Sequence, residues 1–223
     1  MIPIGDDNSA RRITPVVTYV LIALNLLVFL LELNNGEPFI QRWAFVPRRF
    51  LADPAGDFIT LFTSMFMHAG WVHLLGNMLY LWIFGDNVED RFGHALFLVF
   101  YILCGLAATF AQMAFNMASD IPNLGASGAI AGVLGAYIMM FPRSRVHVLL
   151  GRFVTPMSAL IVIGFWFLLQ IFSQVSAFTA SSQTEGGGVA YMAHIGGFVA
   201  GVILTFLLGG TRRALPPRGS YRY

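Results

Sequence analysis

Two short motifs place a serine and a histidine inside separate apolar stretches of the chain. The sequence GASG at residues 125–128 stands at the start of one stretch, and AHIGG at residues 193–197 lies in another. Polar groups are costly to bury in lipid unless they are paired, so we expect Ser127 and His194 to meet. An imidazole that accepts the hydroxyl proton activates serine for nucleophilic attack. The motifs therefore predict a serine nucleophile with a histidine base inside a membrane.

The apolar stretches carry no acidic residue at the depth expected for this pair. Asp120 and Glu185 fall in connecting segments, and Glu32 closes the first apolar stretch. A serine–histidine–aspartate triad is therefore not expected. The simplest interpretation is a dyad of Ser127 and His194.

A tetrahedral intermediate also needs hydrogen-bond donors for its oxyanion. His73 and Asn77 are four residues apart and project from one face of a helix. Together with the backbone N–H of Ser127, they are candidate donors. A purely structural role, in which both side chains bond neighbouring helices, stays open. His68 lies on another face, and we expect it to hold the first loop in place.

The histidines could instead hold a metal ion. His68 and His73 lack the spacing and the glutamate of the HExxH motif, and Cys104 is the only cysteine. This ligand set is too small for a zinc site. We therefore expect neither a metal nor any other cofactor.

The composition indicates which solvent surrounds these residues. The chain is 57% hydrophobic and 11% charged, whereas soluble domains carry about 25% charged residues. Its net charge is only +2, and its basic residues, all arginine, are not clustered on one soluble face. A nucleic-acid partner is therefore not expected. The expected surroundings are a lipid bilayer.

Six apolar segments are separated by charges and turn residues, and 223 residues have room for six spans with short loops. These observations predict an all-α polytopic membrane protein with six transmembrane helices. The segments are residues 16–33, 66–85, 94–117, 127–141, 156–177 and 189–208.

The arginines predict how the spans are oriented. Ten of them fall on one side of the membrane and three, in the loop 34–65, on the other. The positive-inside rule then places both termini in the cytoplasm and the loops 34–65 and 181–188 outside. We expect residues 1–13 to form a cytoplasmic segment and residues 211–223 a disordered cytoplasmic tail.

Simple helix arithmetic places the reactive groups in one layer. Counted from the ends of their spans, Ser127 and His194 lie roughly 8 Å below the outer surface and His73 roughly 10 Å. The irregular backbone before Ser127, which includes Gly125, is tolerated at this depth only beside a protein or water cavity. Small residues, among them Gly128 on the fourth span and Gly197 and Gly201 on the sixth, would let these two helices approach closely.

Taken together, three motifs resemble those of the rhomboid intramembrane serine proteases over about residues 14–210. The motifs are His68-x4-His73-x3-Asn77, Gly125-x-Ser127-Gly128 and Ala193-His194-x-Gly196-Gly197, in this order along the chain. The resemblance implies a six-helix rhomboid fold, a Ser127 nucleophile, a His194 general base and an oxyanion site that His73 and Asn77 support. His68 would match the structural histidine that comes first in the family pattern.

The resemblance also implies a class of substrates. Rhomboid substrates are single-span membrane proteins, cleaved at or near the membrane without a cofactor. We expect a multi-pass protein of a bacterial inner membrane.

Two positions depart from the family pattern. Many rhomboids carry a tyrosine that packs under the catalytic histidine, and Ala131 stands at that position here. Tyr137 and Tyr191 are candidates for holding the histidine instead. Many members also have a Trp-Arg pair in the first loop, where this chain has Ile59-Thr60.

Two other classes of protein are compatible with six spans. One is a catalytically inactive rhomboid relative that binds or escorts membrane clients, and the other is a transporter or a structural membrane protein. Loss of the serine or histidine is typical of the inactive class, and both residues are present here. Neither a transporter nor a structural protein needs this set of serine, histidine and asparagine.

Overall fold

The structure is a computed structural model that describes residues 1–9, 11–179 and 190–210. A long helix occupies each of the six segments that the sequence predicts as spans. These helices are α1 (Val16–Asn35), α5 (Trp71–Phe92), α6 (His94–Phe115), α7 (Ser127–Met140), α8 (Ala159–Thr179) and α9 (Tyr191–Leu207). Between α1 and α5 lie α2 (Glu37–Trp43), α3 (Pro47–Ala52), α4 (Thr60–Thr63) and the 3-10 turn η1 (Ser64–Phe66). The tail 211–223 and the loop 181–188 lie outside the described residues.

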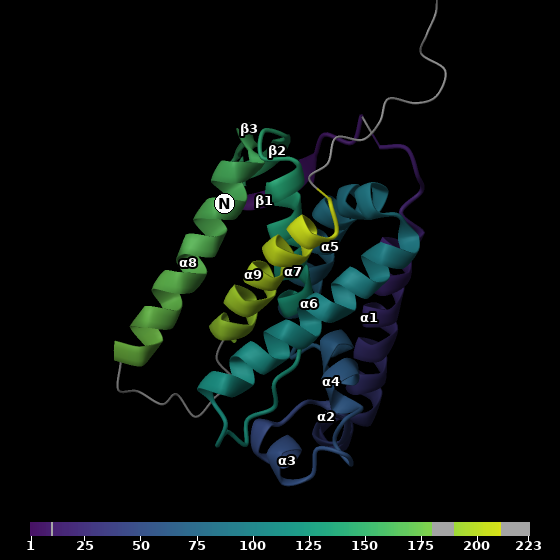
Figure 1. Cartoon of the computed structure of the whole chain (residues 1–223), viewed down its shortest axis with the longest axis vertical. Helices are drawn as coiled ribbons and strands as arrows, with labels where there is room; N and C mark the ends of the chain where they lie inside the picture. Colours follow the sequence, from purple (N-terminus) through teal and green to yellow (C-terminus); the bar gives the residue numbers. More distant parts are fainter. Residues whose placement is uncertain (10, 180–189, 211–223) are drawn as a thin grey trace, which may run out of the picture.

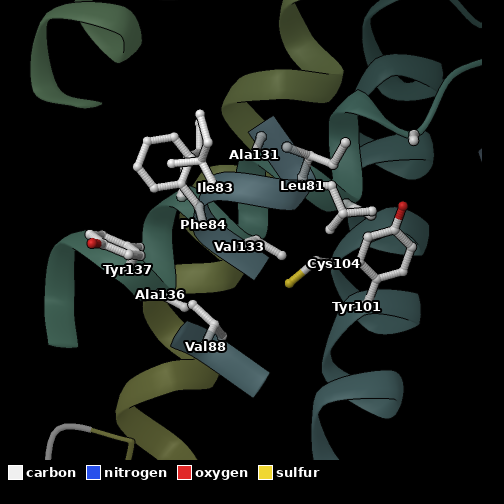
Figure 2. Close-up of a cluster of buried hydrophobic side chains, with 14 of the residues drawn as sticks. Leu81, Ile83, Phe84, Val88, Tyr101, Cys104, Ala131, Val133, Ala136 and Tyr137 are labelled. Carbon is white, nitrogen blue, oxygen red and sulfur yellow. The ribbon is translucent and has the colours of Figure 1, made fainter. Parts of the chain in front are cut away.

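Helix α7 lies at the centre of the bundle, with α5, α6 and α9 packed around it (Figure 1). Its ten consecutive residues from Gly128 to Tyr137 are all buried. A helix that is apolar on every side is stable only when other elements cover it completely. Figure 2 shows part of the resulting core, to which α5 contributes Leu81 and Phe84, and α6 contributes Cys104.

Glycines let α9 approach α7 closely. A methyl group on Gly197 would overlap the carbonyl oxygen of Gly128, and one on Gly201 would overlap that of Gly132. Two helices can come this close only where neither has a side chain at the crossing. The small residues predicted to face each other on the fourth and sixth spans therefore do so.

Helix α5 begins and ends later than its predicted span. It starts at Trp71, and it continues through the charged stretch 86–92, beyond the predicted end of the span at residue 85. The reason is that Glu89 has partners at the start of α1: its carboxylate accepts from the backbone N–H groups of Val17 and Thr18, at 2.9 and 2.7 Å. Free N–H groups at a helix N-terminus favour an acidic partner.

A small antiparallel sheet corrects the all-α prediction. Its strands are β1 (Ile2–Asp6), β2 (Arg145–Leu150) and β3 (Phe153–Ser158), in the order β1-β2-β3. Val146 and Val148 alternate with exposed residues along β2 and join the core. This alternation is typical of a half-buried strand, but β2 is too short to appear among long apolar segments. The sheet lies at one end of the bundle, opposite α2 and α3 (Figure 1).

Several helices have the length and surface of membrane spans. Among the described residues, α1, α6 and α8 are long and apolar enough to cross a membrane, and α7 and α9 are apolar but shorter. Large apolar side chains such as Leu30 of α1 and Phe172 of α8 are more than half exposed. Lipid, rather than water, suits such a surface. The fold is that of a mainly helical, multi-pass membrane protein.

Candidate active site

The structure brings Ser127 and His194 into direct contact. Ser127 is the first residue of α7, and His194 lies in the first turn of α9. Ser127 Oγ is 2.8 Å from His194 Nε2, and both residues are half-buried. This distance lies within hydrogen-bond range, as transfer of the hydroxyl proton to the imidazole requires.

The backbone before Ser127 is held by the first loop. The Gly125 N–H donates to the Ser64 carbonyl at 2.9 Å, and the Asn123 N–H donates to the Phe45 carbonyl at 2.7 Å. Gly125 has φ +131°, which L side chains rarely adopt. Glycine at this position therefore permits the turn that delivers Ser127 to the start of its helix.

Arg49 anchors this first loop in place of the Trp-Arg pair. Its Nε donates to Asp57 Oδ1 at 2.7 Å, and its terminal nitrogens donate to the carbonyls of Gln41 and Ala44. Asp57 is buried, so the ion pair is partly shielded from solvent. Thr60 is also buried and bonds the Asp57 carbonyl at 2.7 Å. The loop is therefore fixed from within, although the family pair is absent.

Helix α8 supplies the second partner of the histidine. His194 Nδ1 is 2.9 Å from Gln170 Oε1, and the Trp166 ring lies 5.8 Å from the imidazole centroid at an interplanar angle of 38°. Neither Gln170 nor Trp166 was predicted from the sequence. The prediction of Tyr137 as a residue that holds the histidine is wrong, because the Tyr137 hydroxyl donates to Asp6 at 2.6 Å. Tyr191 provides neither hydrogen bond of the imidazole.

His73 lies beside the dyad. A methyl group on Gly125 would sit 3.0 Å from His73 Nε2 and 3.6 Å from Ser127 Oγ, so the two side chains flank this glycine. The predicted oxyanion donor His73 is thus close to the serine. Its ring also packs edge-on against that of His68, with centroids 5.0 Å apart.

The Asn77 side chain contacts His68 and not the serine. It is buried, and its Nδ2 is 2.9 Å from His68 Nε2. His68 is tied in turn to α1, since its backbone N–H donates to Glu32 Oε2 at 3.0 Å. The two predicted oxyanion donors on α5 therefore have different neighbours. His73 lies near Ser127, whereas Asn77 makes a buried contact with His68.

A small cavity of about 20 Å³ adjoins the serine. Its polar lining includes Ser64, Thr109, Asn123 and Ser127. This volume accommodates one water molecule, and these side chains offer it partners. Across the described ranges, no group of three or more His, Cys, Asp or Glu residues is arranged to hold a metal ion.

The sequence is similar to those of known proteins. The Rhomboid domain family matches residues 55–211. The rhomboid protease GluP of Bacillus subtilis (strain 168) is 32% identical over 209 residues, which cover 93% of this chain and 36% of GluP. Rhomboid protein 1, mitochondrial, of Saccharomyces cerevisiae is 28% identical over 192 residues, 84% of this chain and 51% of that protein. The mitochondrial presenilin-associated rhomboid-like protein of Homo sapiens is 32% identical over 133 residues, 58% of this chain and 34% of that protein.

This chain spans about a third to a half of the length of these relatives. The family match nevertheless covers well over half of the chain, and Ser127, His194, His73 and Asn77 all fall within it. The apolar helices and their close packing around α7 agree with the membrane fold that the match implies. This chain belongs to the rhomboid family.

Proposed function

We propose that this chain is an intramembrane serine endopeptidase that cleaves single-span membrane proteins in or near their transmembrane segment. The observation that carries the proposal is the 2.8 Å contact between Ser127 Oγ and His194 Nε2. The same contact would be unnecessary in a relative that only binds clients.

In the proposed reaction, Ser127 Oγ attacks the scissile carbonyl carbon while its proton passes to His194 Nε2. The tetrahedral intermediate collapses as the imidazolium gives that proton to the leaving amine, and an acyl-serine remains. A water molecule then gives a proton to His194 and attacks the ester. The second collapse returns the proton to Ser127 and releases the new carboxyl end.

The proposed oxyanion site lies at the start of α7. The backbone N–H groups of Ser127 and Gly128 belong to the first helical turn, where no intrahelical acceptor is available. The position of His73 and Ser127 on either side of Gly125 supports a ring N–H of His73 as a further donor. Asn77 would contribute only after turning from His68, so His73 is the main side-chain donor in this proposal.

The proposed topology has six spans with both termini in the cytoplasm. It rests on the ten-to-three division of the arginines between the two sides. In this arrangement the sheet lies on the cytoplasmic side. The dyad lies toward the opposite side, where the cavity beside Ser127 gives water a place to bind.

Labelling with a fluorophosphonate probe tests the proposal. The purified protein in detergent should form one covalent adduct, which peptide mass spectrometry should place on Ser127. Ser127→Ala and His194→Ala should both abolish the adduct, and Ser158→Ala, at the far end of β3, should leave it unchanged. Absence of an adduct on a folded wild-type protein, together with binding of single-span proteins, would favour a client-binding relative.

A further inference from the structure

The two ring nitrogens of His194 have different partners, and this difference bears on which nitrogen carries the proton. Nε2 faces Ser127 Oγ at 2.8 Å, and Nδ1 faces Gln170 Oε1 at 2.9 Å. A general base for Ser127 needs a free electron pair on Nε2, so the neutral ring must carry its hydrogen on Nδ1. The group opposite Nδ1 therefore matters for the chemistry.

The orientation of the Gln170 amide is fixed by its own helix. Gln170 Nε2 donates to the Trp166 carbonyl at 3.3 Å. A carbonyl oxygen can only accept, so the NH₂ group must point toward Trp166 and the amide oxygen toward His194. Since the amide oxygen is also only an acceptor, Nδ1 must be the donor in this contact.

The reversed amide would have the opposite effect. It would set two carbonyl oxygens, those of Gln170 and Trp166, against each other. It would also present N–H groups to Nδ1, which would then accept and leave the hydrogen on Nε2, facing the serine. In that tautomer His194 could not take the hydroxyl proton.

Trp166 and Gln170 act from one face of α8. They are four residues apart, so their side chains lie one above the other on the helix. The indole ring beside the imidazole limits rotation of the histidine, and the amide selects its tautomer. Two side chains of α8 thus contact the histidine. On α7, Ala131 has no aromatic ring that could pack against it.

We propose that Gln170 is a positioning residue that holds the His194 imidazole in the tautomer and orientation needed by Ser127. The inference rests on the proposed protease function. A neutral amide suits this depth, because a charged carboxylate inside a membrane would be costly. Gln170 supplies the orienting acceptor that an aspartate provides in soluble triads, without its charge.

Three variants test the role of Gln170. Gln170→Met keeps the length of the side chain and removes the amide acceptor, so kcat should fall roughly tenfold to a hundredfold with KM nearly unchanged. Gln170→Glu in its uncharged form offers a carbonyl oxygen to Nδ1 and an O–H to the Trp166 carbonyl, so it should recover most of that loss. Gln174→Met is the matched control one turn further along α8, where the residue bonds neither imidazole nitrogen, and it should keep wild-type kcat.

Nitrogen-15 NMR of histidine-labelled protein in detergent gives an independent measurement. The His194 signals, assigned by comparison with His194→Ala, should show a protonated Nδ1 and an unprotonated Nε2 in the wild type. Gln170→Met should show a mixture of both tautomers. This readout would not respond to a merely structural role of Gln170.

Several results would overturn the inference. They are a wild-type His194 protonated on Nε2, an unchanged kcat in Gln170→Met, or a change confined to KM. If Gln170→Met fails to fold, the wild-type spectrum alone decides. Failure of the protease proposal is seen separately, because the wild type would then neither cleave a single-span substrate nor react with a fluorophosphonate.

Discussion

At the scale of single residues, the two proposed oxyanion donors differ in what else they do. His73 lies across Gly125 from Ser127, whereas Asn77 is buried with its amide nitrogen on His68. Loss of the His73 ring should therefore affect the reaction more than the fold. Loss of the Asn77 amide would also leave a buried ring nitrogen of His68 without its partner.

His73→Ala should lower kcat by up to about 10²–10³, the range for one oxyanion donor, and leave thermal unfolding nearly unchanged. Asn77→Ala should lower kcat less and destabilise the protein by about 1–3 kcal/mol. Cleavage kinetics and thermal unfolding in detergent measure the two effects. His147→Ala, an exposed histidine in β2, is the control for both. Wild-type kcat in His73→Ala would rule out this histidine as a donor.

The sequence was enough to predict the contact between Ser127 and His194, because each polar group in an apolar stretch needed a partner. It was not enough to predict Gln170. Gln170 and Gln174 are the same residue type in the same apolar stretch, and only the rotation of α8 decides which one faces the histidine. Tyr137 was misassigned for a similar reason, since its hydroxyl meets Asp6, a residue 131 positions away.

At the scale of elements, the contact between α7 and α9 sets the geometry of the dyad. Gly197 of α9 crosses α7 at Gly128. Gly128 is one residue after Ser127, and Gly197 is three residues after His194. A side chain at this crossing would separate the two helices where they carry the serine and the histidine. The glycines therefore influence the rate through distance rather than through chemistry.

Gly197→Ala should destabilise the protein by about 1–3 kcal/mol, because its methyl group overlaps the Gly128 carbonyl. A separation of even about 1 Å should lower kcat by about a hundredfold. Gly164→Ala is the matched control, since a methyl group there meets nothing within 4 Å. It should be neutral or slightly stabilising. Equal kcat and stability in both variants would show that the crossing is not as tight as described.

The six long helices could be predicted because each contains an apolar segment bounded by charges or turn residues. The end of α5 could not, because Asp86 and Glu89 look like loop residues until Arg11 and the N-terminus of α1 are placed against them. The sheet was missed because the pairing of β1 with β2 joins residues about 140 positions apart. The alternation within β2 spans only six residues, so it does not stand out in the sequence before this pairing is known.

At the scale of the whole molecule, the end of the bundle that carries the sheet is closed by a polar cluster. Asp6 at the end of β1 accepts from the Tyr137 hydroxyl of α7 at 2.6 Å and from Asn87 Nδ2 of α5 at 2.7 Å. Arg11 pairs with Asp86 nearby at 2.7 Å. These contacts tie the N-terminal segment to two helices of the core.

Asp6 should make stability depend on pH. Burial, with the nearby carboxylates of Asp86 and Asp7, raises the pKa of Asp6 from 3.8 to about 6, against the opposing effect of the Tyr137 hydrogen bond. The folded protein therefore holds this proton more tightly than the unfolded chain does. The stabilising contribution is complete below pH 3.8 and is lost as the pH rises through about 6. Between pH 5 and pH 8, wild type should lose stability relative to Asp6→Asn.

Thermal unfolding of both proteins at the two pH values measures this difference. Asp7→Asn is a graded comparison, because removing its carboxylate takes away one of the nearby charges that raise the pKa of Asp6. It should lose less stability than wild type between the two pH values, but more than Asp6→Asn, because burial still raises the pKa of Asp6 in this variant. A wild type that gains stability over Asp6→Asn on going to pH 8 would contradict the burial of Asp6.

Cleavage of a single-span substrate by the protein in proteoliposomes tests the central claim most directly. The wild type should cleave it, and Ser127→Ala, His194→Ala and the double variant should all fall to the same background, since the two residues act as one unit. Chelators should have no effect on the wild-type rate. A folded Ser127→Ala protein that cleaves at the wild-type rate would contradict the account.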